Sequence, residues 1–315
     1  MIIPTLNEER MIGACLQALV AQDLARERIS VVVVDNGSTD GTLGVIDTFR
    51  EQLAVRVFQR PGLRISGLRN FGVAQVDTPV IAFLDADCLP EPDWAARALV
   101  ALDTLGPRII LGGDYRIPPA SSWLARAWFE QRSAPKSGSV GYLPSGNLLM
   151  RRAEFLALGG FDESLQTNED AELCARARGT GFSVHADPQL AVVHLGTPQT
   201  IAQFFRKQRW HGSHVFRVFL RSRGRQNLKP VALAFTTIIA GGALPVTLAY
   251  AASGGRLEPA SIAAALLLGP PLTLASRSIL RHGRVRYFLP IAAAVLLYGV
   301  ARAASILQSG RSSRG

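Results

Sequence analysis

Carboxylate side chains follow two of the apolar runs in the first half of the chain. Asp85 and Asp87 come directly after Val80–Leu84, and Asp35 comes directly after the β-branched run Ile29–Val34. Such runs are typical of buried strands in a parallel sheet, where ligands bind beyond the carboxyl ends of the strands. Two carboxylates one residue apart supply hard oxygen atoms that suit Mg²⁺ or Mn²⁺ held jointly with a diphosphate. The alternative interpretation of either motif is a solvated turn, which Asp also favours.

A third acidic group begins a predicted helix further along the chain. Glu169 and Asp170 follow Asn168 at the start of a helical pattern that runs to Arg178. A carboxylate at this place is a candidate general base, which accepts a proton from a hydroxyl group as that oxygen attacks. The competing explanation is structural, because acidic side chains at a helix N-terminus interact favourably with the helix dipole.

Strand and helix signals alternate from residue 1 to residue 220. Apolar runs predict strands at 1–3, 29–34, 55–58 and 79–84, and periodic apolar residues predict helices at 8–20, 42–49, 63–76 and 91–102. This alternation predicts parallel βαβ units and an α/β fold. Polar loops follow three of these strands, at 4–8, 35–41 and 85–87, so we expect the three loops to converge at one edge of the sheet. Gly-containing turns at 145–147 and 159–162 let the backbone approach a ligand.

The net positive charge of the protein comes from its last third, because basic and acidic residues nearly balance in the rest of the chain. The 315 residues carry 34 Lys and Arg against 24 Asp and Glu, a net charge of +10. Residues 221–315 hold 12 of the basic residues and one acid, so the first 220 residues hold 22 basic and 23 acidic residues, a balance of 22 − 23 = −1. Nucleic-acid binding requires basic residues spread over the folded domain. The charge distribution therefore argues against a nucleic-acid partner.

Three uncharged runs lie within the basic last third, at Val231–Ala252, Pro259–Ser276 and Tyr287–Ala301. A membrane-spanning helix needs about 20 apolar residues. The first run meets this length, whereas the other two are shorter and Pro270-Pro271 interrupts the second. We expect two to three transmembrane helices, at about 231–252, 259–276 and 287–307, after a domain boundary at residues 220–221. A buried, soluble helical domain is the alternative explanation.

The arginine clusters predict how these helices are oriented. Basic residues gather at 221–229 and 277–286. The loop between the first two uncharged runs has only two charged residues, Arg256 and Glu258. The positive-inside rule places both clusters in the cytoplasm. We therefore expect membrane lipid as a partner, with the first domain on the cytoplasmic side of the inner membrane. Three widely spaced cysteines suggest no disulfide framework, which fits a reducing compartment.

Seven motifs occur in an order that resembles one known family. They are PTLNEE at 4–9, VVVVDNGSTDGT at 31–42, LRNFG at 68–72, FLDADCLP at 83–90, SGNLLMRR at 145–152, GGFDESL at 159–165 and NEDAELCARARGTGF at 168–182. Together they resemble a family 2 glycosyltransferase of the GT-A fold over roughly residues 1–220. The resemblance implies a Rossmann-like mixed sheet flanked by helices. It also implies inverting transfer of a sugar from a nucleoside diphosphate sugar, with Mg²⁺ or Mn²⁺ as the cofactor.

The resemblance also implies roles for individual residues. Asp170 is the implied general base with Glu169 beside it, and the implied metal ligands are Asp87, Asp85 and His194. The implied nucleotide-sugar pocket is formed by Pro4, Thr5, Asn7, Glu8, Asp35, Asn36, Arg69, Asp85, Asn147, Arg209 and Trp210. Among these residues, Asp35 is the implied contact to the base, which favours a UDP-sugar donor, and Arg69 is expected near the phosphates.

One signature of the resembled family is incomplete. Where many members have QxxRW, this chain reads Arg206-Lys207-Gln208-Arg209-Trp210, which argues against a processive synthase. His211 and His214, three residues apart on the same predicted helix, are weaker candidates for metal binding. The membrane tail points to a lipid-linked or envelope saccharide as the acceptor. The rival hypothesis is a membrane-anchored binding or scaffold protein that retains an inactive GT-A fold.

Overall fold

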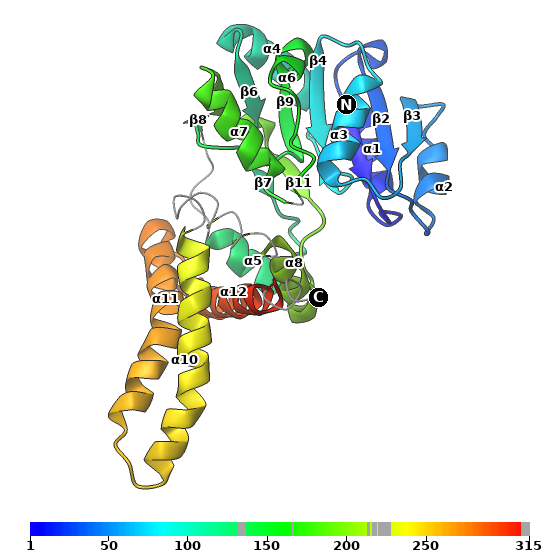
Figure 1. The fold of residues 1–315 in the computed structure, drawn as a ribbon. Coiled ribbons are helices and arrows are strands. Elements are labelled where there is room, and N and C mark those ends of the chain that lie inside the picture. Colours follow the sequence, from blue (N-terminus) through cyan, green and yellow to red (C-terminus); the bar gives the residue numbers. More distant parts are fainter. Residues whose placement is uncertain (132–136, 166, 213–214, 216–218, 220–227, 310–315) are drawn as a thin grey trace. The chain divides into compact units, whose positions relative to one another are not determined.

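The computed structural model describes residues 1–309 except 132–136, 166, 213–214, 216–218 and 220–227 (Figure 1). The chain divides into two compact units, one formed by Met1–Pro118 and Ala134–Gly196, the other by Pro119–Ser133 and Thr197–Gly315. The predicted domain boundary at residues 220–221 lies outside the described residues.

An eight-stranded mixed sheet forms the centre of the first unit. Across the sheet the strands are β3 (Ala54–Gln59), β2 (Ser30–Asp35), β1 (Ile2–Thr5), β4 (Val80–Leu84), β9 (Asn147–Arg151), β6 (Ile109–Gly112), β10 (Ser183–Ala186) and β8 (Gly138–Ser139). The four strands from β3 to β4 are parallel, as the sequence predicts. β9 runs antiparallel to both β4 and β6, and this reversal makes the sheet mixed.

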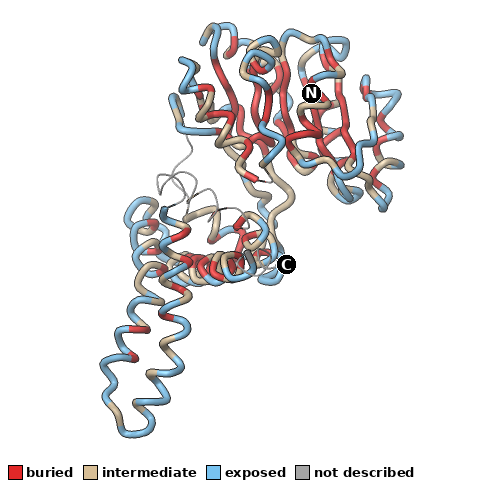
Figure 2. Tube along the Cα trace, viewed as in Figure 1, coloured by how far each residue is buried: buried red, intermediate tan, exposed pale blue. Residues whose placement is uncertain are grey.

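Side chains of the central strands alternate between two hydrophobic cores. On β2, Val31 and Val33 pack into one core, whereas Val32 and Val34 pack into the other. Successive residues of a strand point to opposite faces, so an unbroken run of valines supplies both cores at once. The sheet is therefore covered on both faces (Figure 2).

Six helices cover the two faces of this sheet. The first core receives side chains from α1 (Ile12–Val20), α2 (Thr42–Asp47) and α4 (Trp94–Leu105). The second receives side chains from α3 (Ile65–Ala74), α6 (Arg152–Ala157) and α7 (Glu169–Gly179). These layers confirm the predicted GT-A-like architecture of a mixed sheet flanked by helices. The predicted helix at 8–20 begins later, at Ile12, after a turn in which the N–H groups of Met11 and Ile12 donate to the Glu8 carbonyl.

A small three-stranded sheet adjoins the end of β4. β11 (Val192–His194) pairs antiparallel with β5 (Cys88–Leu89) and parallel with β7 (Tyr115–Arg116). In this register His194 lies directly opposite Cys88. The pairing therefore brings His194 beside a residue that is far away in sequence and adjacent to Asp87.

The described residues of the second unit form helices and no strands. Its described helices are α5 (Trp123–Glu130), α8 (Ile201–Gly212), α10 (Leu228–Ala252), α11 (Glu258–His282) and α12 (Phe288–Ser309). Three helical segments are long and apolar enough to cross a membrane: Leu228–Ala252, Glu258–His282 and Val285–Gln308. Pro270 and Pro271, expected to interrupt the second apolar run, lie inside α11, which continues through them. The second segment is consequently longer than its uncharged run.

Candidate active site

The register of the parallel strands brings the predicted polar loops to one edge of the sheet. Thr5 at the end of β1 lies opposite Asp35 at the end of β2, and Ile2 of β1 lies opposite Phe83 of β4. Asp85 follows β4 by one residue, so it reaches the same edge. The three loops that the sequence singled out therefore converge, as parallel strands require.

The loop after β2 is organised by the Asp35 carboxylate itself. The buried Asp35 Oδ2 accepts hydrogen bonds of 2.9 Å from the backbone N–H groups of Gly37 and of Ser38, and its Oδ1 accepts one from the Ser38 hydroxyl. Both oxygens are thus engaged within their own turn. The neighbouring Asn36 has a buried Oδ1 for which the described residues provide no hydrogen-bond partner. Asn36 therefore offers the open acceptor of this loop.

The loop after β1 is tied to the loop after β2 by hydrogen bonds. The Asn7 side-chain oxygen accepts a 2.9 Å bond from the Thr39 N–H, and the Asn7 N–H donates to Ser38 Oγ at 2.9 Å. The Glu8 N–H donates to Thr42 Oγ1 at 2.8 Å. Pro4 and Thr5 are buried at the end of β1, next to this tie. Asn7 and Glu8 thus fix the mutual position of the loops.

Arg69 joins two of the predicted acidic groups from within the protein. Its side chain, from α3, is only 3% exposed, and it contacts Asp85 Oδ1 at 2.8 Å and Glu169 Oε1 at 2.7 Å. Burial opposes the charge of this guanidinium, but Asp85 and Glu169 hold the pKa of Arg69 above its usual value. Ser145 Oγ also donates to Glu169 Oε1, at 3.3 Å. Arg69 thus cross-links the Asp85 loop to the start of α7, and its expected place near the phosphates stays a prediction.

Asp170 has the electrostatic surroundings of a general base. It lies in the first turn of α7, where the Ala171 N–H donates to its Oδ1 at 2.7 Å. Burial, followed by the adjacent carboxylate of Glu169, raises the pKa of Asp170 from 3.8 to about 6. The ideal pKa of a catalytic base lies near the working pH. Asp170 is therefore both poised to accept a proton and largely ionised at pH 7.

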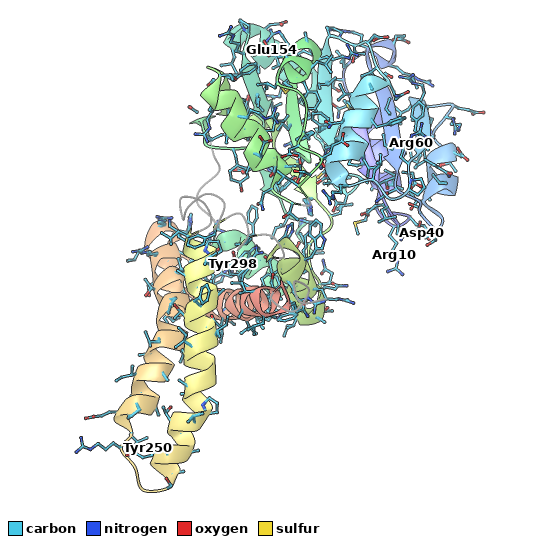
Figure 3. The ribbon with its side chains drawn as sticks, viewed as in Figure 1. Arg10, Asp40, Arg60, Glu154, Tyr250 and Tyr298 are labelled. Atoms are coloured by element: carbon cyan, nitrogen blue, oxygen red, sulfur yellow. The ribbon has the colours of Figure 1, made fainter. Side chains whose placement is uncertain are left out.

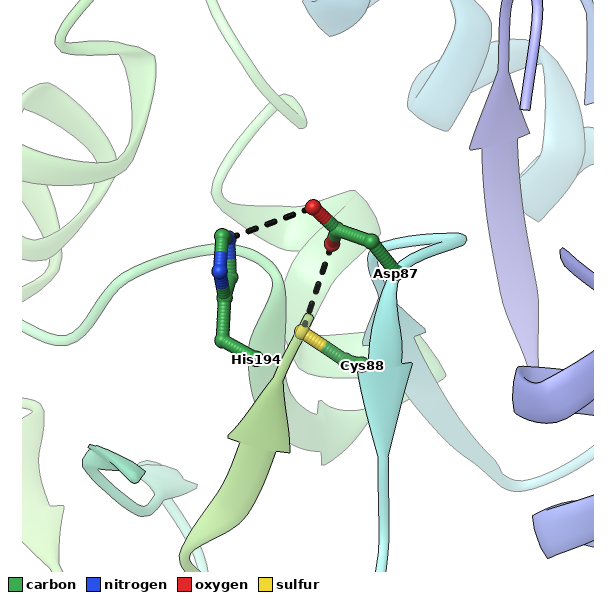
Figure 4. Close-up of side chains that lie close together, drawn as sticks. All are labelled: Asp87, Cys88 and His194. Carbon is green, nitrogen blue, oxygen red and sulfur yellow. Dashed lines mark hydrogen bonds and ion pairs between the residues drawn. The ribbon is translucent and has the colours of Figure 1, made fainter. Parts of the chain in front are cut away.

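Asp87 and His194 form a candidate metal centre with Cys88 (Figure 4). His194 Nε2 lies 3.4 Å from Asp87 Oδ2, and potential ligand atoms of the three residues lie within 4.8 Å of one another. Burial raises the pKa of Cys88, so its protonated Sγ contacts Asp87 Oδ1 at 3.7 Å as a weak donor. Carboxylate and imidazole together suit Mn²⁺, whereas Mg²⁺ prefers oxygen ligands alone. Asp85 is not a member of this cluster.

Two glycines allow the backbone to approach these carboxylates. A Cβ on Gly146 would collide with Asp85 Oδ2 and with the Tyr115 hydroxyl, and a Cβ on Gly196 would collide with Asp87 Oδ2. Tyr115 was not among the sequence candidates, because nothing near it in the chain marks it. Its ring centroid lies 4.9 Å from that of His194. Burial and then Asp85 raise the pKa of Tyr115 far above its usual value, so its hydroxyl remains a donor.

Asn147, a predicted pocket residue, is fully buried and bound to protein groups. Its amide nitrogen donates to the carbonyl oxygens of Gly113 at 3.0 Å and Leu190 at 2.7 Å. Its side-chain oxygen accepts a 3.2 Å bond from Trp94 Nε1. In the structure Asn147 thus ties β9 to the loops behind Asp85 and presents no free polar atom to a ligand.

The remaining sequence candidates belong to the second unit. Arg209 and Trp210 lie on α8, where Trp210 is 57% exposed and its ring contacts that of His211. His214 lies outside the described residues.

Comparison with known proteins identifies the family of this domain. The model of the family described as Glycosyl transferase family 2 matches residues 1–157, a stretch that contains β1, the Asp35 turn, Arg69 and the Asp85–Asp87 loop. The protein carries a family 2 glycosyltransferase domain. Asp170 and His194 of this transferase unit lie beyond the matched stretch.

Relatives of the transferase domain are named as a glycosyltransferase and as a polysaccharide biosynthesis protein. A validoxylamine A glucosyltransferase of Streptomyces hygroscopicus subsp. limoneus is 28% identical over 238 residues, covering 64% of this chain and 49% of the relative. The succinoglycan biosynthesis protein ExoA of Rhizobium meliloti is 26% identical over 279 residues, covering 85% of this chain and 83% of ExoA. The chain spans about half the length of the first of these relatives.

A solved structure has the same fold as the transferase chain. The mannosyltransferase PcManGT of Pyrobaculum calidifontis, in complex with GDP-Man and Mn²⁺, superposes with a TM-score of 0.62 at 21% identity. The match covers 96% of this chain and 85% of the mannosyltransferase. This likeness establishes the GT-A fold.

Proposed function

We propose that the protein transfers a sugar, with inversion, from a nucleoside diphosphate sugar to a hydroxyl group of a lipid-linked or envelope saccharide. The single observation that carries the proposal is the buried Arg69 bridge between Asp85 and Glu169, which joins the strand-end carboxylates to the base-bearing helix. The family 2 domain and the glycosyltransferase names of its relatives support the same reaction class.

Asp170 is the proposed general base. It accepts the acceptor hydroxyl proton while that oxygen forms a bond to the anomeric carbon. The bond from this carbon to the diphosphate oxygen breaks, and the nucleoside diphosphate leaves with the electron pair. Attack opposite the leaving group inverts the anomeric carbon in one displacement. The pKa of Asp170, about 6, supports this role because the carboxylate is ionised at neutral pH.

The nucleotide pocket is proposed to lie between the loops after β1 and β2. Asn7 and Glu8 tie these loops together, and Asp35 shapes the turn. The buried, unpartnered Asn36 Oδ1 is the atom that we assign to the N–H of the base, in place of Asp35, whose oxygens are engaged. An acceptor oxygen here suits the N3–H of uracil. A UDP-sugar remains the favoured donor, although the Pyrobaculum mannosyltransferase of the same fold was solved with GDP-Man.

Mg²⁺ or Mn²⁺ is the proposed cofactor, held by Asp87 and His194. When bound, the cation supplies charge that neutralises the donor diphosphate as it leaves. The imidazole in the donor set favours Mn²⁺, the cation present in the Pyrobaculum structure. Asp85 is placed beside this site, with Arg69 as its positioning residue rather than a direct ligand of the phosphates.

The helical unit is proposed to anchor the enzyme to the cytoplasmic membrane with the transferase domain in the cytoplasm. Three described segments have the length and apolarity of spans. The arginines between α11 and α12 fit a cytoplasmic side under the positive-inside rule. A membrane anchor brings the domain to acceptors carried on lipid, which supports the proposed acceptor class.

The test uses the full chain in nanodiscs and follows sugar transfer and donor binding separately. UDP-, GDP- and dTDP-sugars are screened with Mn²⁺ and Mg²⁺ by thermal shift, and the stabilising donor is then assayed with lipid-linked saccharides. Asp170→Asn should lower transfer at least a hundredfold while donor binding is retained. Asp103→Asn, at a side chain that is 87% exposed, is the matched control. Near-normal transfer by Asp170→Asn would contradict the assignment of Asp170 as the general base. If the wild type binds the donor but transfers no sugar, the rival hypothesis of an inactive scaffold protein is favoured.

A further inference from the structure

α12 packs against two short helices as well as against the hairpin of α10 and α11. Its Ile291, Ala294 and Val295 share a hydrophobic cluster with Leu124 of α5 and Phe204 of α8. The Trp128 ring of α5 also contacts the Tyr298 ring of α12, with centroids 4.9 Å apart. As a result, 44% of an 18-residue apolar stretch within Val285–Gln308 is buried by protein. The corresponding share is 22% for each of the other two candidate spans.

The partners of α12 carry charges that the hydrocarbon core of a bilayer does not accommodate. Besides their apolar faces, α5 and α8 carry Arg126, Glu130, Arg206, Lys207 and Arg209. Charged side chains at the centre of a bilayer are costly and rare. A helix that lies along α5 and α8 must therefore share their depth, which is that of the membrane surface.

Contacts along α12 reach these polar helices from one end to the other. Just before α12, Arg284 forms an ion pair with Glu130 of α5. Near its C-terminus, a Cβ on Gly212 of α8 would lie 2.7 Å from Ser305 Oγ and 2.9 Å from Arg302 Nη1. A spanning helix would carry one of these two ends across the bilayer, away from the charged helices. Both ends of α12 therefore lie at the same depth.

The length of the uncharged part of α12 supports the same arrangement. Tyr287–Ala301 contains 15 residues before Arg302, which corresponds to about 22 Å of helix against a hydrocarbon core of about 30 Å. α10 has 25 residues and no charge after Lys229, or about 37 Å. α10 is long enough to cross the core, and the 18-residue uncharged run Pro259–Ser276 of α11, about 27 Å, nearly reaches that length. The uncharged part of α12 is the shortest of the three.

The hairpin and α12 point in different directions within this unit. Figure 1 shows α10 and α11 side by side and α12 lying across them. α12 meets the hairpin near its open end, where a Cβ on Gly299 would lie 2.7 Å from Thr237 Oγ1. The far part of the hairpin, which ends beside the labelled Tyr250, is mostly exposed (Figures 2 and 3).

Apart from Gln308 near the C-terminus, the exposed residues among 288–308 of α12 form a narrow apolar stripe. Its members are Leu289, Ala293, Val300 and Leu307, which recur at spacings of four and seven residues on one face. The flanking faces are buried or partly buried by protein. An apolar stripe on a helix whose other faces are covered by protein, including the charge-bearing helices α5 and α8, fits insertion into the boundary between headgroups and acyl chains.

We propose that α12 lies in the plane of the membrane surface, with this stripe facing the acyl chains, and that only α10 and α11 cross the bilayer. The inference rests on the proposed membrane association of the helical unit. It predicts two spans, with the end of α12 on the same side as the transferase domain. The stripe contacts lipid at the cytoplasmic surface of the membrane.

The first test locates single cysteines introduced into the full chain, whose three native cysteines are buried. Glu51→Cys, Ser253→Cys and Gln308→Cys report on the transferase domain, the hairpin turn and the end of α12. A membrane-impermeant maleimide should label Ser253→Cys in intact spheroplasts, and Glu51→Cys and Gln308→Cys only in inverted vesicles. Labelling of Gln308→Cys from the same side as Ser253→Cys would overturn the inference. Release of the whole chain by carbonate would overturn the membrane anchor as well.

The second test measures the depth of the stripe. An environment-sensitive fluorophore is attached to Ala293→Cys, Val300→Cys or Leu307→Cys and quenched by lipids that carry a quencher at known depths. An in-plane helix gives the three positions equal depths. A spanning helix gives neighbouring positions depths that differ by about 10 Å for each seven residues, which would refute the proposal.

Discussion

At the scale of single residues, Asp170 links burial to a measurable pH dependence. Burial and then Glu169 raise the pKa of Asp170 to about 6, so the carboxyl group holds a proton below that pH and cannot accept one from the acceptor. We expect kcat/KM to rise as pH increases through about 6 and to fall about tenfold per pH unit well below it. Steady-state rates between pH 4.5 and 8 measure this profile. A flat profile across pH 6 would contradict the assignment.

Arg69 is the residue whose loss should damage stability most directly. Arg69→Met leaves Asp85 and Glu169 close together without their shared cation. Breaking such a buried pair from one side costs about 3–5 kcal/mol. Urea denaturation of the full chain in detergent measures the change. Arg97→Met is the matched control, because Arg97 and Asp93 pair at the surface with 43% and 40% exposure, and such pairs contribute about 0–1 kcal/mol. Equal costs in both variants would remove the special role of Arg69.

His194 should control the affinity for Mn²⁺, because its pairing opposite Cys88 places its imidazole next to Asp87. His194→Gln removes the imidazole 3.4 Å from Asp87 while retaining a polar side chain of similar reach. We expect Mn²⁺ to bind at least tenfold more weakly, and preference for Mn²⁺ over Mg²⁺ to fall, because the imidazole nitrogen is lost from the donor set. Titration of Mn²⁺ by electron paramagnetic resonance provides the measurement. His185→Gln on β10 is the control, and unchanged Mn²⁺ affinity in His194→Gln would exclude His194 as a ligand.

At the scale of elements, the loop before β9 depends on a glycine. Gly146→Ala introduces a Cβ that collides with Asp85 Oδ2 and the Tyr115 hydroxyl, so the β4 loop must shift. We expect donor binding to weaken at least tenfold and stability to fall by about 1–3 kcal/mol. Calorimetric titration and denaturation measure the two effects. In Gly141→Ala the new Cβ has no neighbour within 4 Å, so this nearby variant should bind donor normally.

At the scale of the whole molecule, the exposed apolar surface of the helical unit has a different meaning from that of the transferase unit. Ile239 near the middle of α10 is 64% exposed, and Val100 on α4 is 67% exposed. Ile239→Asp places a charge at the centre of a proposed span, at a cost of about 2.5–3.5 kcal/mol. It should reduce the carbonate-resistant membrane fraction, whereas Val100→Asp should not. Equal membrane fractions for the two variants would contradict a transmembrane α10.

Much of the fold and the composition of the site could be predicted from the order of residues in the chain. The valine run at 31–34 predicts a strand buried on both faces, and Asp85 and Asp87 after Val80–Leu84 predict a polar strand end. These features are local, because the residues of a strand and the residue that follows it are neighbours in the sequence. The uncharged run Val231–Ala252 is local in the same sense, and it lies within the observed α10.

Only the tertiary structure decided which of these groups meet. Arg69 and Glu169 are 100 residues apart in sequence, and their ion pair depends on α3 and α7 packing on the same face of the sheet. His194 reaches Asp87 because β11 pairs with β5. Both oxygens of Asp35 accept hydrogen bonds because its own turn folds back onto it. Likewise, the composition of α12 predicts that it is apolar. It does not predict that α12 packs against α5 and α8. Residue types set what chemistry is possible, whereas contacts between distant segments set which atoms share a site, because local sequence carries no information on long-range pairing.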